Sequence, residues 1–173
     1  MPTILTHAIV PSALGLGVGS HVVSFPLLMS GIVASVLPDL DVLAFHFGIS
    51  YSHQFGHRGF SHSILFAVLL GLIALMFSSA LQSNRMQAFT FIFISALSHS
   101  LLDMLTNGGM GVALLWPVSE TRFFAPWQFI EVSPLSLHRI FSSRGLAVFL
   151  SELKWVWIPA ITIGCLLAVV SRK

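Results

Sequence analysis

His57-Arg58-Gly59-Phe60-Ser61-His62-Ser63 is a short polar stretch between long apolar segments of this chain. Two other stretches share its character: Leu37-Pro38-Asp39-Leu40-Asp41 precedes it, and Ser98-His99-Ser100-Leu101-Leu102-Asp103 follows it. Three of the six acidic residues lie in these motifs. Carboxylates beside histidines in apolar surroundings call for a neutralising cation, because an unpaired charge is costly to bury. The three motifs therefore predict a shared metal site.

The composition around these motifs is typical of an integral membrane protein. Of 173 residues, 55% are hydrophobic and only 8% are charged, and the mean hydropathy is +0.91. Five runs contain no Asp, Glu, Lys or Arg: 1–38, 63–84, 86–102, 104–119 and 155–171. Several approach the roughly 20 residues that a helix needs to cross a bilayer. We expect one membrane-embedded domain over residues 1–173, crossing the membrane several times.

The apolar segments predict an all-α helical bundle of about four to five helices. Residues 63–81 and 88–102 flank a polar turn and form a helical hairpin, which returns the chain to the side it left. His62 and the His99/Asp103 pair then share one end of the bundle. If residues 8–46 make two passes, His7 lies at that end too. We therefore expect the His/Asp metal site at one end of the bundle.

The remainder of the chain predicts the orientation. Residues 104–154 are aromatic and mixed, as in a segment lying at the membrane interface, and residues 155–171 form a last apolar helix. The site side would carry Arg58, Arg122, Arg139, Arg144 and Lys154, against Arg85, Arg172 and Lys173 on the other side. Positive residues favour the cytoplasmic face, so we expect the site there.

Several classes of protein and site are excluded. Cys165 is the sole cysteine, so an intramolecular disulfide and a thiolate metal cluster are both ruled out. The net charge is +2, and the basic residues behind it are scattered along the chain, which gives no basic face for nucleic acid. Residues 1–15 lack the basic start of a cleaved signal peptide. Membrane lipids are the expected surroundings, and the sequence leaves the oligomeric state open.

Two carboxylate motifs supply candidate ligands. His99 and Asp103 are four residues apart, about 6 Å on one helix face, which suits two ligands of one ion or of adjacent ions. The alternative is a hydrogen-bonded polar pair inside the bundle. Of Asp39 and Asp41, one would bind the metal directly, and the other would support or bridge. The alternative for these two is a helix cap and a solvated turn carboxylate.

The central stretch adds two histidines and an arginine. His57 and His62 flank Gly59, so both rings can face one cavity. Arg58 offers a planar fork suited to an anionic substrate oxygen, although an arginine at the membrane interface is the alternative. With His7, the predicted ligands number seven, more than one ion needs: His7, Asp39, Asp41, His57, His62, His99 and Asp103.

Such a nitrogen and oxygen ligand set suits Zn²⁺ or Mn²⁺, and also iron, better than calcium. Seven ligands favour two ions that clamp the attacking and leaving oxygens of a displacement at phosphorus. A metal-activated water would then be the nucleophile. In this hypothesis Arg58 holds the phosphoryl oxygens, and Asp41 accepts the proton of the water.

The motifs resemble a known family. Pro38-Asp39-Leu40-Asp41, the stretch 57–63, and His99 to Asp103 with Thr106, Gly109 and Leu115-Trp116-Pro117 are similar to the YdjM family of bacterial inner-membrane proteins. This family is described as LexA-regulated and metal-dependent, with a hydrolase label that is largely inferred. It also resembles, distantly, the all-helical zinc phospholipase C and P1 nuclease group. The resemblance covers about residues 1–125, leaves 126–173 uncovered, and implies phosphodiester chemistry.

We therefore predict a membrane-bound metal-dependent hydrolase that acts on a phosphoester, with a lipid-derived phosphoester as one candidate. A membrane metal transporter using the same ligands without turnover is the first alternative. A scaffold protein whose metal serves folding alone is the second.

Overall fold

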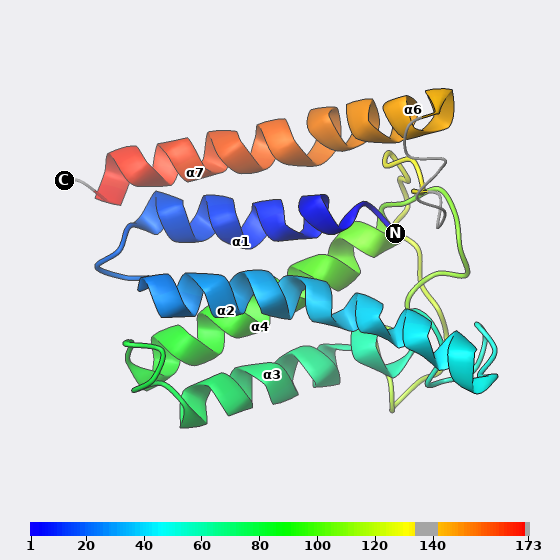
Figure 1. Ribbon diagram of the computed structural model, residues 1–173, viewed down its shortest axis with the longest axis horizontal. Helices are drawn as coiled ribbons and strands as arrows, with labels where there is room; N and C mark the ends of the chain where they lie inside the picture. The colour runs from blue at the N-terminus through cyan, green and yellow to red at the C-terminus, as the bar shows by residue number, and fades with distance from the viewer. Residues whose placement is uncertain (134–141, 172–173) are drawn as a thin grey trace.

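The computed structural model describes residues 1–133 and 142–171, and its elements are helical (Figure 1). In chain order they are α1 (Ile4–Val18), α2 (Phe25–Val36), η1 (Leu37–Phe47), η2 (Phe60–His62), α3 (Ile64–Met76), α4 (Arg85–Met104), α6 (Ser143–Glu152), η3 (Leu153–Trp157) and α7 (Ile158–Ser171). Across these ranges the only β-type pairings are two isolated bridges. The predicted all-α fold is confirmed. The basic residues Arg139, Arg172 and Lys173, which entered the orientation argument, lie outside the described residues.

α2 and η1 form one continuous helical rod from Phe25 to Phe47. The Ser24 side chain caps its start by accepting a hydrogen bond from the Leu27 N–H. At Pro38 the missing N–H and the rigid ring end the α-helical hydrogen bonding, and the tighter 3₁₀ helix η1 carries both aspartates onward. Gly48, at a φ of 72°, stops the rod in the left-handed region.

α3 and α4 form the predicted hairpin. Ser63 caps α3 at the Phe66 N–H, and Asn84 with Gln87 makes a reciprocal capping box at the start of α4. The first helix is shorter than predicted, since it ends at Met76 instead of Leu81 and turns occupy the residues before Asn84. An apolar run does not mark where a helix ends, because the turn residues here are themselves apolar or small.

α6, η3 and α7 join into a single 29-residue helix, Ser143–Ser171. The predicted start at residue 155 was therefore wrong, because residues 143–154 belong to the same helix. α7 lies along α1 (Figure 1), and Gly17 faces Gly164 where the two backbones meet.

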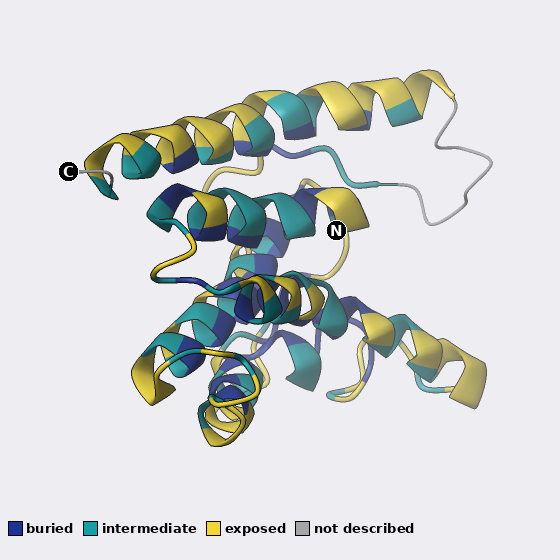
Figure 2. Ribbon diagram, turned by 60° about the vertical axis from the view of Figure 1, so that its left-hand side comes forward, coloured by how far each residue is buried: buried dark blue, intermediate teal, exposed yellow. Residues whose placement is uncertain are grey.

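Among the described residues, two helices are long and apolar enough to cross a membrane: Phe25–Phe47 and Ser143–Ser171. The apolar helices Ile4–Val18 and Ile64–Met76 are shorter. Exposed residues cover much of the outer surface of α7 (Figure 2), and they include Ile161, Leu166 and Val170. An apolar outer surface of this kind suits contact with lipid.

The bundle core and the site occupy different parts of the bundle. Buried residues of α2, α3 and α4 and of the turn before α2 form an apolar cluster: Val23, Leu27, Ala34, Ala67, Ala74, Ala88, Ile92 and Ala96. The start of α1, the far end of α2, the start of α3 and the end of α4 meet at one end of the bundle (Figure 1). This is the arrangement that the parity argument predicts for His7, Asp39, His62 and Asp103.

The segment after α4 folds back over that end. The backbone N–H groups of Ala125 and Ile130 donate to the carbonyls of Met104 and Leu105, and Val112 pairs with Phe123. These bonds hold residues 105–130 against the last turn of α4, where they enclose the predicted site.

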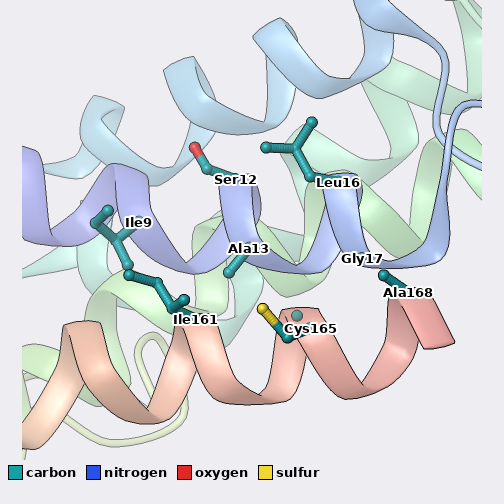
Figure 3. A pocket seen from close by; sticks show the side chains of 9 residues that line it. Ile9, Ser12, Ala13, Leu16, Gly17, Ile161, Cys165 and Ala168 are labelled. Atoms are coloured by element: carbon teal, nitrogen blue, oxygen red, sulfur yellow. The ribbon is translucent and has the colours of Figure 1, made fainter.

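The contact between α1 and α7 generates a prediction. A Cβ atom at Gly164 would lie 2.6 Å from the Ala13 carbonyl oxygen. Next to this contact is an apolar groove of about 310 Å³, lined by Ile9, Ser12, Ala13, Leu16, Gly17, Ile161, Gly164, Cys165 and Ala168 (Figure 3). Gly164→Val should force the helices apart and destabilise the protein by about 1–3 kcal/mol, the usual cost of overpacking.

Thermal unfolding in detergent, followed by circular dichroism, measures this effect. Val170→Leu is the control, because it adds volume to the same helix at a residue that is 70% exposed. Equal unfolding midpoints for the two variants would contradict the close helix contact.

Candidate metal centre

Four side chains from three helices form the centre of the site. Asp39 of η1, His62 of η2, and His99 and Asp103 of α4 each offer one ligand atom, and these atoms all lie within 4.8 Å of one another. All four residues are buried, with exposed fractions from 0% to 6%. The i,i+4 spacing on α4 points His99 and Asp103 to the same side, as the sequence predicts.

His7 joins this group from the first turns of α1. Its Nε2 lies 3.7 Å from Oδ1 of Asp103 and 3.9 Å from Oδ2 of Asp39. Its ring stacks on that of His99 with centroids 3.7 Å apart. Five of the seven predicted ligands therefore converge on one point, and we call His7, Asp39, His62, His99 and Asp103 the central cluster.

The central cluster has polar atoms that lack partners. Within the described residues, neither ring nitrogen of His7 and neither carboxylate oxygen of Asp39 has a hydrogen-bond partner. The oxygens of Asp103 have ionic contacts with Arg58 and, at 4.0 Å, with the N-terminal ammonium of Met1, and longer contacts with histidines. Leaving such groups buried without a partner is costly. A divalent cation would satisfy Nε2 of His7 and the carboxylate oxygens of Asp39 and Asp103 together, so the residues present fit a metal ion.

The histidine rings are oriented toward the same point. Nδ1 of His99 lies 2.7 Å from the Ser35 carbonyl oxygen, to which it must donate a proton. Nε2 of His99 therefore carries a lone pair, and it lies 3.0 Å from Nε2 of His62. Two nitrogens this close need a proton or a cation between them. A backbone carbonyl behind a metal-binding histidine is a common way to set its tautomer.

His62 links the central cluster to a second group. Its Nδ1 lies 3.1 Å from Oδ2 of Asp41. Burial lowers the pKa of His62, but the neighbouring carboxylates of Asp103 and Asp41 outweigh burial and raise the pKa to about 9. A cation that binds Nε2 must therefore displace a proton, which makes metal binding pH-dependent.

Asp41 points away from the central cluster. Its carboxylate lies 2.6 Å from Nδ1 of His57 and accepts hydrogen bonds from the Arg58 N–H and the Ser61 hydroxyl. Asp41, His57 and His62 form a second group that could hold an ion. The same contacts equally suit a carboxylate that orients two histidines from behind. Asp39 and Asp41 thus diverge, because Asp39 faces the central cluster and Asp41 faces His57.

Arg58 lies inside the protein. Its side chain is fully buried, its Nε is 2.9 Å from Oδ2 of Asp103, and its terminal nitrogens donate to the Gly108 carbonyl and the Thr106 hydroxyl. The backbone of Arg58 has a φ of 63°, which turns the side chain inward. The sequence predicts a fork open to a substrate oxygen, whereas the structure turns this fork onto Asp103. The guanidinium therefore braces a ligand.

Several residues support the site without being among its predicted ligands or catalytic residues. Ser35 supplies only a carbonyl oxygen. Gly109 leaves room for the guanidinium, since a Cβ there would lie 2.7 Å from a terminal nitrogen of Arg58. Arg122 donates to the carbonyls of His57 and Tyr51 and holds the central stretch in place. Main-chain contacts of this kind leave no mark on residue type, so only the structure identifies these supports.

Comparison with known proteins adds family context. The family model described as YdjM inner membrane protein matches residues 1–173. Inner membrane protein YbcI of Escherichia coli (strain K12) is 49% identical over 160 residues, which are 92% of each chain. Inner membrane protein YdjM of the same strain and that of Shigella flexneri are each 35% identical over 112 residues, 58% of this chain and 53% of theirs. No solved structure matches, and the likeness to P1 nuclease stays a prediction.

The central cluster predicts metal binding that depends on its members. His62→Ala and Asp103→Ala should each abolish stoichiometric zinc or manganese binding, because each removes a ligand atom from a buried set of five. Elemental mass spectrometry of protein purified without chelators measures this. His46→Ala is the control, since His46 is an exposed residue of η1. A wild-type protein free of metal, or variants with wild-type metal content, would contradict the site.

The brace on Asp103 predicts a second effect. Arg58→Lys keeps the positive charge but loses the fork that contacts Asp103, Thr106 and Gly108, so metal affinity should fall about 10–100-fold. Competition with a chromophoric chelator gives the affinity. Arg144→Lys is the matched control, because Arg144 is exposed and pairs only with Glu131 and the Val132 carbonyl in the described residues. An unchanged affinity in Arg58→Lys would show that Asp103 needs no brace.

Proposed function

Because this chain belongs to the YdjM family of inner membrane proteins, we propose that it is a metal-dependent hydrolase of the bacterial inner membrane that acts on phosphoesters. The observation that carries the proposal is the central cluster. Five His and Asp side chains are buried together, and most of their ligand atoms have no other partner. A protein that is only 8% charged has little reason to bury them without a bound cation.

The ligand chemistry favours Zn²⁺ or Mn²⁺. Imidazole nitrogens and carboxylate oxygens without thiolate suit these ions, and iron, better than calcium. When bound, such an ion lowers the pKa of a water molecule and polarises a phosphoryl oxygen. The second group around Asp41 offers a place for a second ion in the same site.

The residues of the chain have separable roles in this proposal. Asp41 aligns the rings of His57 and His62, and the Ser35 carbonyl aligns His99. Arg58 holds Asp103 and adds a positive charge beside it. This charge makes the site attractive to an anionic group even though the fork itself is occupied. When no ion is bound in the second group, the Asp41 carboxylate, which contacts His57 and His62, can act as a base.

A lipid phosphoester is the substrate that we favour. Aromatic residues gather at the end of the bundle that carries the site. Phe129 stacks on Trp155, and Lys154 lies over the Trp155 ring. Trp with Lys is typical of the membrane interface, the depth at which lipid phosphates lie. We place this interface on the cytoplasmic side, following Arg122, Arg144 and Lys154.

A transport function is the weaker candidate. An ion path would have to continue from the site through the bundle, but the described interior of α2, α3 and α4 is the apolar cluster around Leu27, Ala67 and Ile92. A metal that serves folding alone is favoured by one observation, the nearly complete burial of the central cluster. Turnover is the property that separates this role from that of an enzyme.

Hydrolysis of phosphoesters tests the proposal, followed as p-nitrophenol from the nitrophenyl diester, inorganic phosphate from phosphatidic acid, and the lipid and headgroup products of phosphatidylglycerol. Protein loaded with Zn²⁺ or Mn²⁺ in nanodiscs is given bis-p-nitrophenyl phosphate, phosphatidic acid and phosphatidylglycerol. Asp39→Asn and His99→Ala should reduce the rate at least about 100-fold, since each removes a metal ligand. His46→Ala should keep the wild-type rate. A metal-loaded wild type that is inactive on every substrate, or a rate unchanged in Asp39→Asn, would sink the hydrolase proposal and leave the folding role.

A further inference from the structure

Glu152 is a buried carboxylate outside the motifs. It is the last residue of α6 and is 1% exposed. One of its oxygens accepts a hydrogen bond from the Thr3 N–H at 2.6 Å, and the other accepts from the Thr3 and Thr6 hydroxyls at 2.7 Å each. All three donors lie at the start of α1, nearly 150 residues away in the sequence.

The position of these donors explains why a carboxylate lies there. Thr3 is the residue before α1, and its own side chain makes no capping hydrogen bond to the helix. The first turn of a helix has free N–H groups and a partial positive charge, which a carboxylate satisfies. Glu152 therefore caps α1 from a distant helix. Because Glu152 is far from α1 in the sequence, no local sequence pattern around α1 predicts this cap.

The cap is continuous with the central cluster. Thr6 donates to Glu152 and accepts a hydrogen bond from Nε1 of Trp157 at 2.7 Å. The next residue is His7, whose ring nitrogens have no hydrogen-bond partner among the described residues. The other cluster histidines are aligned by Ser35 and Asp41. His7 is aligned only through stacking on His99 and through the position of the first turn of α1.

We propose that Glu152 is a positioning residue of the metal centre, which fixes the first turn of α1 through Thr3 and Thr6 and thereby sets the position of His7. The last helix of the chain, to which the resemblance in the motifs does not extend, is then part of the site's support. The proposal concerns metal binding and rests on the central cluster, and it holds for an enzyme and for a folding role alike.

Glu152 variants should still fold, because α7 has other anchors on α1. Gly17 and Gly164 are in backbone contact, and the Ser171 hydroxyl donates to the Gly17 carbonyl at 3.0 Å. The loss of the cap should therefore displace the first turn of α1 while the helix pair stays together. This separates an effect on His7 from a general loss of structure.

Cobalt(II) is the probe for the test, because its visible absorption reports ligand geometry and its affinity is measured by competition with a chelator. Glu152→Gln and Thr6→Val should weaken cobalt binding about 10–100-fold, as supporting residues of metal sites do, and should change the absorption spectrum. Thr6→Ser keeps the hydroxyl and should restore both. Glu131→Gln is the control, a half-buried glutamate that pairs with Arg144 and lies outside the central cluster.

A double-mutant cycle with His7→Ala decides between positioning and packing. If Glu152 acts through His7, Glu152→Gln should have almost no further effect on cobalt affinity in the His7→Ala background. The same loss in both backgrounds, or a Glu152→Gln protein with the wild-type spectrum and affinity, would overturn the proposal. A wild type that binds no cobalt would overturn it as well, and this result is distinct because it removes the metal centre itself. Inactivity of a cobalt-binding wild type bears on the hydrolase proposal alone.

Discussion

The burial of Asp39 and Asp103 beside three histidines is the constraint on which the rest of the structure depends. Two carboxylates in an apolar bundle would repel each other and would lose their hydration. Arg58 offsets one of the two charges, but within the described chain the oxygens of Asp39 receive no hydrogen bond. A divalent cation removes this deficit, so we regard the metal and the fold as coupled.

The support of the central cluster is built in layers that come from different parts of the chain. Asp41 and the Ser35 carbonyl lie behind two of the histidines, and Arg58 lies behind Asp103. Glu152 holds the start of α1, the helix that carries His7. Each support is a hydrogen-bond acceptor or a charged fork with its own partners, which limits the movement of the ligand that it contacts.

The position of the site at one end of the bundle connects it to the membrane. α2 with η1, and the helix from α6 through α7, are the candidate spans, and both have one end near the site. The apolar interior lies between α2, α3 and α4, away from the ligands. A site at the end of the bundle suits the hydrolysis that we propose, since lipid phosphates lie at the membrane interface. This is why we prefer hydrolysis of a lipid phosphoester to ion conduction.

The sequence by itself determined the helical class, the hairpin of α3 and α4, and the gathering of the motifs at one end, because apolar runs and chain reversal are local properties. The i,i+4 spacing of His99 and Asp103 likewise predicts a shared direction. Only the tertiary structure decided that Asp39 faces the central cluster while Asp41 faces His57, since this depends on the 3₁₀ turn after Pro38. The inward turn of Arg58 and the cap from Glu152 also required it, because both are contacts between residues 45 to 149 positions apart.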